Sequence, residues 1–116
     1  MSLHWTEEQY QHYLRRGQPP PISEAIWQGT IMRLLKQADY MAYHTFDSRK
    51  SPSGWPDVAA IKPTGGLLYM AELKTDTGQV PPAQQAWLQA LGQCTGVVAE
   101  VWRPSAMEEI IERLRG

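Results

Sequence analysis

The chain has 116 residues, 42% of them hydrophobic and 20% charged, a composition that suits one globular domain and excludes a disordered chain. Its single cysteine, Cys94, cannot form an internal disulfide, and no Cys-x-x-Cys motif or His/Cys cluster indicates a zinc site. The formal charge of -1 argues against a general polyanion binder, although a basic face on a neutral protein is compatible with it. The first residues lack the features of a signal peptide and no apolar run reaches membrane-spanning length, so we expect a cytoplasmic protein.

Residues 1–21 are expected to form a helical arm ahead of one globular domain over residues 22–116. Thr6 is a candidate N-cap with Gln9 as its capping-box partner, and glycine and three prolines end the predicted helix near Arg16. Aromatic and basic side chains are interleaved along this helix. Two interpretations stay open: a nucleic-acid arm, or an amphipathic helix packed on the domain or on a second subunit.

Ser23 is the predicted N-cap of a second helix over residues 24–37. Glu24 and Gln28 lie on the same face as the apolar stripe of this helix, where the stripe would meet the end of a sheet. Glu24 either favours the positive end of the helix dipole or completes an acidic site. The stripe itself consists of Trp27, Ile31, Leu34, Leu35 and Ala38.

An aromatic and β-branched strand is predicted over residues 40–46, followed by a polar loop over residues 47–53. The loop carries Arg49 and Lys50, with Ser51 directly after them. These three side chains suit contacts to phosphate oxygens. A solvated basic loop is the alternative interpretation.

A β-hairpin is the centre of the predicted domain. Its strands, residues 58–62 and 67–73, are joined across a turn whose paired glycines allow positive φ angles. The hairpin brings Asp57 toward Glu72. Because side chains alternate across a strand, Glu72 and Lys74 leave the same, otherwise apolar face, which indicates a site at the strand end.

Three more elements follow the hairpin. Pro81-Pro82 starts a third helix that carries Gln84 on its apolar face. The near-continuous apolar run over residues 97–102 predicts a strand in the interior of the sheet. Ser105 and Glu108 form a candidate capping box for the last helix. The predicted order is α-α-β-β-β-α-β-α.

Asp57, Glu72 and the backbone carbonyl of Leu73 offer hard oxygen ligands for Mg²⁺ or Mn²⁺. Mg²⁺ usually keeps several waters, so two carboxylates leave room for a phosphate oxygen and an attacking water. The arrangement is typical of phosphodiester hydrolysis.

Three further side chains are candidate catalytic residues. Lys74 could orient or deprotonate the attacking water, or neutralise charge in the transition state. Glu24 could bind a second ion or position a water. Gln84 could hold Lys74 or a phosphate.

Seven motifs occur in order along the chain: Ser23-Glu24 with Gln28, Ser48-Arg49-Lys50-Ser51, Gly54-Trp55-Pro56-Asp57, Glu72-Leu73-Lys74-Thr75, Gly78, Pro82 with Gln84 and Trp87, and Trp102-Arg103-Pro104-Ser105. Together they resemble the VRR-NUC group of the PD-(D/E)XK nuclease superfamily, in the small stand-alone form found in phages and bacteria. The resemblance spans residues 22–114. Two positions depart from the pattern, since Ala83 and Ala106 stand where relatives commonly carry acidic residues.

The resemblance implies an α/β fold with a restriction-endonuclease-like core, a mixed β-sheet flanked by helices. It also implies roles for the candidate residues. The metal would be bound by Asp57, Glu72 and the Leu73 carbonyl. Glu24 matches the acidic residue of the early helix, Lys74 the catalytic lysine and Gln84 the helix glutamine. Stand-alone members are similar in being homodimers that cut branched DNA such as four-way (Holliday) junctions.

We therefore expect a Mg²⁺- or Mn²⁺-dependent DNA endonuclease that acts as a homodimer on branched DNA, in the cytoplasm of a bacterial or phage-infected cell. Arg49, Lys50 and Ser51 are its candidate DNA-binding residues. The alternative is a non-catalytic DNA-structure-binding module with the same fold, which the near-neutral charge favours. Junction resolution, flap cutting and sequence-specific restriction are all left open as activities.

Overall fold

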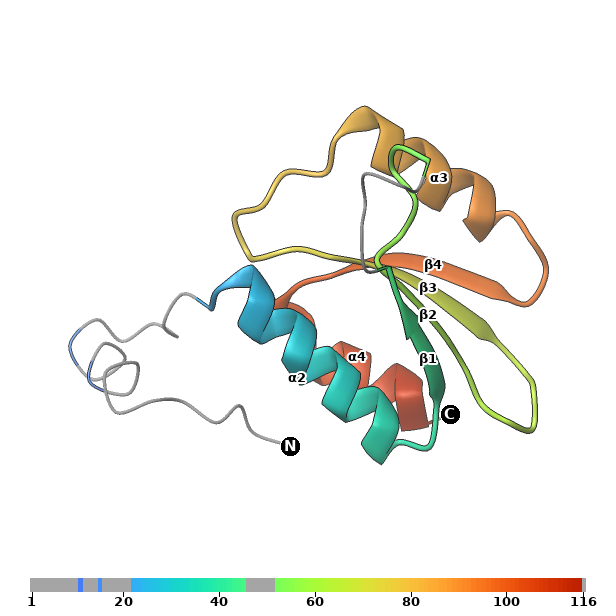
Figure 1. Cartoon of the computed structure of the whole chain (residues 1–116), viewed down its shortest axis with the longest axis horizontal. Coiled ribbons are helices and arrows are strands. Elements are labelled where there is room, and N and C mark those ends of the chain that lie inside the picture. The colour runs from blue at the N-terminus through green and yellow to red at the C-terminus, as the bar shows by residue number, and fades with distance from the viewer. Residues whose placement is uncertain (1–10, 12–14, 16–21, 46–51, 116) are drawn as a thin grey trace.

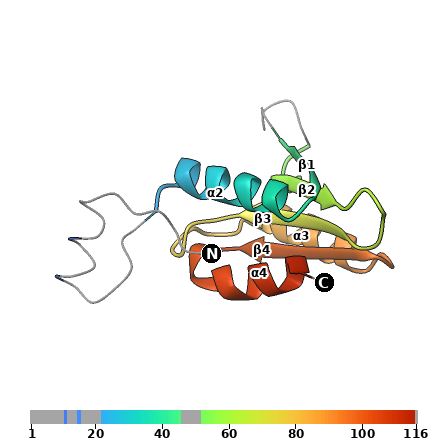
Figure 2. The same ribbon diagram turned by 90° about the horizontal axis from the view of Figure 1, so that it is seen from below.

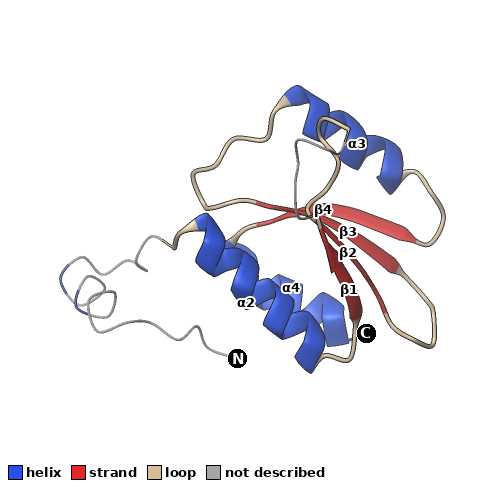
Figure 3. Ribbon diagram, viewed as in Figure 1, coloured by secondary structure: helices blue, strands red, loops and turns tan. Residues whose placement is uncertain are grey.

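The computed structural model describes residues 11, 15, 22–45 and 52–115. The predicted N-terminal helix, apart from Gln11 and Arg15, lies outside the described residues, as do Arg49, Lys50 and Ser51. Within the described part, no helix combines the length and apolar character needed to cross a membrane. Figure 1 labels the elements and Figure 3 colours them by type: α2 (Glu24–Gln37), β1 (Met41–His44), β2 (Val58–Ile61), β3 (Leu68–Leu73), α3 (Pro82–Gly92), β4 (Val97–Trp102), the short 3-10 helix η2 (Pro104–Ala106) and α4 (Met107–Arg115).

Helix α2 begins at the cap expected from the sequence. The Ser23 hydroxyl oxygen accepts a hydrogen bond from the Ile26 backbone N–H at 3.2 Å, which satisfies one of the free donors of the first turn. The helix ends at Gln37 with Ala38 as its C-cap, and Asp39, with φ of 66°, turns the chain toward β1. The buried face of the helix is formed by Trp27, Thr30, Ile31, Leu34 and Leu35.

The four strands form one mixed sheet in the order β1-β2-β3-β4. The pairs β1/β2 and β2/β3 are antiparallel, whereas β3 and β4 are parallel. The hairpin between β2 and β3 turns at Gly65 and Gly66, whose φ angles are 84° and 104°. Positive angles of this kind are accessible to glycine without steric cost, so the Gly-Gly pair determines where the chain reverses.

Helices cover both faces of the sheet, and Figure 1 shows α3 on the opposite side from α2 and α4. Turned by 90°, Figure 2 shows α2 on the side of β1 and α4 on the side of β4. The hydrophobic core lies between the sheet and these two helices. It is formed by Trp27, Ile31, Leu34, Leu35, Val58, Ala60, Tyr69, Ala71, Leu73, Trp102, Ile110 and Leu114.

The prediction that β4 is an interior strand is wrong. β4 pairs with β3 alone among the described strands and forms an edge of the sheet. Its apolar sequence has another cause, because one face of the strand contacts α3 while Val98 and Trp102 on the other face pack into the core. A strand covered by helices on both faces is apolar along its length whether or not it has two neighbours.

The last helix also begins differently from the prediction. Ser105 lies in η2 rather than at the cap of α4, and its backbone N–H donates a hydrogen bond to Asp76 Oδ1 at 2.9 Å. A side chain 29 positions earlier therefore satisfies the donor that the capping box was expected to involve. The contact ties the loop after β3 to the start of this helical segment.

Candidate active site

Two carboxylates meet at the end of the β2–β3 hairpin. Asp57 directly precedes β2, and the register that pairs Val58 with Ala71 places it opposite Glu72. Asp57 Oδ2 accepts a hydrogen bond from the Leu73 backbone N–H at 2.9 Å. Glu72 is only 2% exposed, although it carries a carboxylate. Buried acidic groups are costly unless they are paired, so this pair is a strong indication of a functional site.

Gln84 and Lys74 converge on one oxygen of the buried Glu72. The Gln84 Nε2 amide of α3 donates to Glu72 Oε1 at 3.0 Å, and Lys74 Nζ lies 3.7 Å from the same oxygen. The Gln84 amide thus contacts Glu72 rather than Lys74, the side-chain partner expected from the sequence. The side chains of Asp57, Glu72, Lys74 and Gln84 thus form one connected group.

The pKa of Glu72 is raised from its ordinary value of 4.5 to about 8, chiefly because the side chain is buried. The neighbouring Asp57 carboxyl contributes to this rise, while Lys74 acts in the opposite direction. In the absence of a cation, Glu72 therefore retains its proton near neutral pH. A buried acid that keeps its proton at neutral pH is one in which a bound cation can replace that proton.

The oxygen atoms of the site fit a hard divalent cation. Glu72 Oε2 is buried and has no hydrogen-bond donor among the described residues. In an extended strand the N–H and C=O of one residue point to the same side, so the Leu73 carbonyl points toward Asp57, which accepts the Leu73 N–H. No three His, Cys, Asp or Glu side chains converge within the described ranges. Two carboxylates and one carbonyl are thus the oxygen donors that could hold a cation here, and oxygen donors of this kind suit a hard divalent cation that keeps several waters.

The loop before β2 is held tightly against helix α3. Gly54 has φ of 90°, and a Cβ at this position would lie 2.5 Å from the Ala83 carbonyl carbon and oxygen, so a larger residue does not fit. Trp87 Nε1 donates to the Ser53 carbonyl at 3.0 Å, and the rings of Trp55 and Trp87 meet edge to face with centroids 5.0 Å apart. These contacts fix the loop that ends at the first carboxylate to the helix that carries the glutamine.

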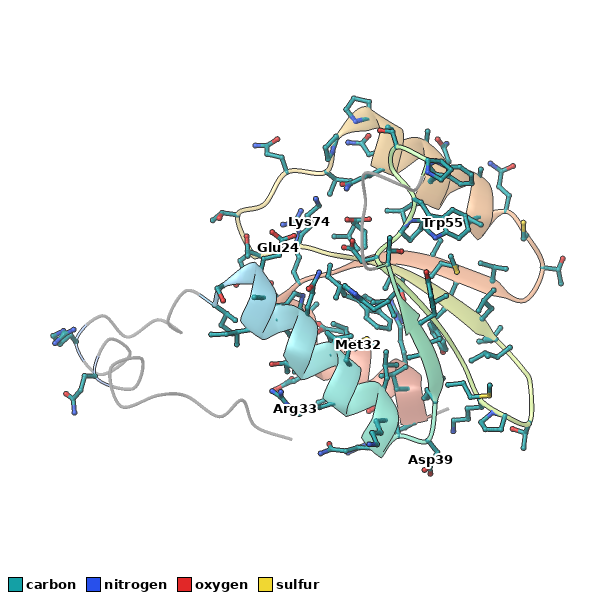
Figure 4. All side chains as sticks on the ribbon, in the orientation of Figure 1. Glu24, Met32, Arg33, Asp39, Trp55 and Lys74 are labelled. Carbon is teal, nitrogen blue, oxygen red and sulfur yellow. The ribbon has the colours of Figure 1, made fainter. Side chains whose placement is uncertain are left out.

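The start of α2 is fixed to the same end of the sheet through a buried tryptophan. Trp27 Nε1 donates to the Trp102 carbonyl at 2.9 Å, and the Lys74 backbone N–H donates to the same carbonyl at 3.1 Å. Glu24 is exposed in the first turn of α2, one turn before Trp27. Figure 4 shows Glu24 and Lys74 at the same end of the molecule. No described hydrogen bond or ion pair joins Glu24 to the connected group.

Sequence reasoning did not identify the contacts that support the site. The packing of the Gly54 loop on α3 and the sharing of the Trp102 carbonyl both depend on contacts between segments remote in sequence. The signal available was the clustering of tryptophan and glycine next to charged candidates, at Gly54-Trp55 and Trp102-Arg103. The candidate DNA-binding residues Arg49, Lys50 and Ser51 lie outside the described residues.

The VRR-NUC domain model matches residues 6–106 of the chain. No curated protein and no solved structure matches it. The family match extends over most of the chain, and the four-stranded mixed sheet flanked by helices agrees with a restriction-endonuclease-like fold. The chain therefore belongs to the VRR-NUC family, a group of nuclease-type DNA-binding domains within the PD-(D/E)XK superfamily.

Proposed function

We propose that the protein is a Mg²⁺- or Mn²⁺-dependent DNA endonuclease that hydrolyses phosphodiester bonds. The observation that carries this proposal is the group at the hairpin end, where Asp57 lies opposite the buried Glu72 and Lys74 Nζ is 3.7 Å from Glu72 Oε1. Burial of an acid costs free energy, and a purely structural role gives no reason for that cost. In a catalytic role, the same group supplies carboxylate ligands for a metal ion next to the ammonium of Lys74.

Asp57, Glu72 and the Leu73 carbonyl are the proposed ligands of the divalent cation. When bound, the cation would supply Lewis-acid stabilisation of the negative charge that develops on the phosphate. Gln84 holds the Glu72 carboxylate through its amide, so the ligand is oriented before the cation enters. Asp57 is oriented in the same way by the Leu73 N–H.

Lys74 is the proposed catalytic lysine. Its ammonium lies beside the carboxylates, from where it can orient the attacking water or neutralise charge on the transition state. Glu24 is proposed to position a water or a second cation from the first turn of α2. Arg49, Lys50 and Ser51 precede the loop that ends at Asp57 and are proposed to contact the DNA backbone.

The proposed substrate is branched DNA such as a four-way junction, cut by a homodimer. Two considerations support this choice. The resemblance is to stand-alone family members of this kind, and one domain of 116 residues offers limited surface for two DNA strands.

Cleavage of end-labelled four-way junction, flap and linear duplex DNA tests the function, in Mg²⁺, Mn²⁺ or EDTA. Paired symmetric cuts in the junction that disappear in EDTA support the proposal, and sedimentation should then report a dimer. Junction binding without cleavage in either metal would instead assign the protein to the binding-module class.

A further inference from the structure

Lys74 is followed by a tight turn that packs against its side chain. The turn runs from Thr75 to Gly78 and is closed by a hydrogen bond from the Gly78 N–H to the Thr75 carbonyl at 3.2 Å. A Cβ built on Gly78 would lie 3.5 Å from both Cβ and Cδ of Lys74. The open side of Gly78 therefore faces the aliphatic part of the lysine with little space between them, and a shift of the turn would change the room that the lysine side chain has.

Arg103 holds both ends of the turn. Its Nη1 donates to the Thr75 carbonyl at 2.6 Å and to the Gly78 carbonyl at 2.8 Å. A third contact comes from the same segment, since the Ser105 N–H donates to Asp76 Oδ1 at 2.9 Å. Hydrogen bonds from a charged donor are stronger than neutral ones, so the two bonds from the guanidinium contribute most to stabilising the turn.

The placement of Arg103 follows from the register of the two parallel strands. Leu73 pairs with Trp102, so the next residues, Lys74 and Arg103, are neighbours at the ends of β3 and β4. Two adjacent cations would compete for Glu72 if both pointed at it. The guanidinium is instead bound to two carbonyls, which leaves Lys74 as the cation beside the carboxylate.

We propose that Arg103 is a positioning residue for Lys74, which it holds through the turn of residues 75–78 without touching DNA or the cation itself. This inference rests on the proposed function, because the role of Lys74 in hydrolysis is part of it. Both bonds of this bridge come from Nη1, the far end of the arginine side chain, whereas a lysine side chain is one bond shorter and its ammonium would not reach both carbonyls from the same backbone position. Arg103→Lys should therefore fail to replace the native residue fully, although it conserves the charge.

A kinetic comparison separates positioning from DNA contact. Arg103→Met should lower kcat for junction cleavage by about 10- to 100-fold, since small misplacement of a catalytic group has effects of this size. Its KM, measured in Mg²⁺, should stay within about twofold of the native value, because no phosphate contact is lost. The same holds for its Kd for the junction, which is measured in Ca²⁺ so that binding is followed in place of cleavage. The kcat of Arg103→Lys should lie between the kcat of Arg103→Met and that of the native protein. Arg113→Met, which removes an ion pair with Glu100, is the matched control and should leave kcat unchanged.

A second readout needs neither metal nor DNA. Brief labelling with an amine-reactive reagent, followed by peptide mass spectrometry, measures how accessible Lys74 is relative to the exposed Lys36. The Lys74 side chain is 16% exposed in the native arrangement. Arg103→Met should raise its labelling by about threefold or more, since loosening the turn frees the lysine. Arg113→Met should leave the labelling unchanged.

Two results would overturn the proposal. One is unchanged labelling of Lys74 in a folded Arg103→Met variant, and the other is a rise in KM and Kd with native kcat, which would make Arg103 a DNA contact. Absence of cleavage by the native protein would refute the proposed function, and the labelling experiment would still decide the role of Arg103.

Discussion

The raised pKa of Glu72 predicts that the metal-free protein loses stability as the pH increases. The folded state keeps a proton on this carboxyl up to a pH of about 8, whereas the unfolded chain releases it near 4.5. The folded state thus binds more protons between these values, and the free energy of unfolding falls across that window. The stabilising contribution is complete below pH 4.5 and is lost as the pH rises through 8.

The magnitude follows from the size of the shift. A rise from 4.5 to about 8 corresponds to about 5 kcal/mol at most, at about 1.4 kcal/mol per pH unit. Even about 2 kcal/mol would lower Tm by about 10 °C in a domain of this length. The loss of stability due to Glu72 is therefore large enough to be measured. A variant that lacks this one titrating group distinguishes it from the titration of other groups.

Glu72→Gln is that variant, because it keeps the shape of the side chain and cannot titrate. Unfolding should be followed between pH 5 and 9 in EDTA for both proteins. We expect the native protein to lose stability relative to Glu72→Gln as the pH rises, and added Mn²⁺ to reverse the loss, with proton release on binding below pH 8. Parallel stability curves for the two proteins in EDTA would show that Glu72 does not lose a raised pKa on unfolding.

Two paired substitutions test the supporting contacts. Gly54→Ala should destabilise the fold by about 2 to 4 kcal/mol more than Gly65→Ala, because both have positive φ but only the first meets backbone atoms at 2.5 Å; equal values from denaturant unfolding would contradict this close contact. Trp27→Phe and Trp102→Phe each remove a buried indole, but only Trp27→Phe removes the hydrogen bond to the shared Trp102 carbonyl. Cleavage rates measured well below Tm should therefore fall further in Trp27→Phe, by about 10-fold, and an equal fall in both would argue against a positioning effect.

The hairpin and the proximity of its charged residues follow from sequence features with short range. Two glycines with positive φ set the turn, and strand alternation then places Glu72 and Lys74 on one face, with Asp57 across from them. These are local rules that operate over about twenty residues. The cap of α2 at Ser23 depends on a contact only three residues away and was predictable for the same reason.

Features that depend on long-range packing could not be predicted in this way. The apolar run of β4 indicates burial, but it cannot distinguish a second strand neighbour from a helix on each face. The two carbonyls that Arg103 binds lie 25 and 28 positions earlier in the chain. The Ser105 N–H, which was expected to be bound by Glu108, is bound by Asp76 from 29 positions earlier. The amide of Gln84 was placed at the site from its helix face, but its actual partner, Glu72, depends on how α3 sits on the sheet.

Asp57 and Lys74 are the residues on which the proposed metal-dependent hydrolysis depends, and a single-turnover cleavage rate measures the contribution of each. The rate would be measured on one labelled junction for the native protein, Asp57→Asn and Lys74→Met, in Mg²⁺ and in EDTA. Asp57→Asn can still accept the Leu73 N–H while losing its charge, so its fold should be retained. We predict cleavage in Mg²⁺ alone and a fall of about 1000-fold or more in each variant, equivalent to about 4 kcal/mol. A native rate in either folded variant, or equal cleavage in EDTA, would rule out the proposed roles of Asp57, Lys74 and the cation.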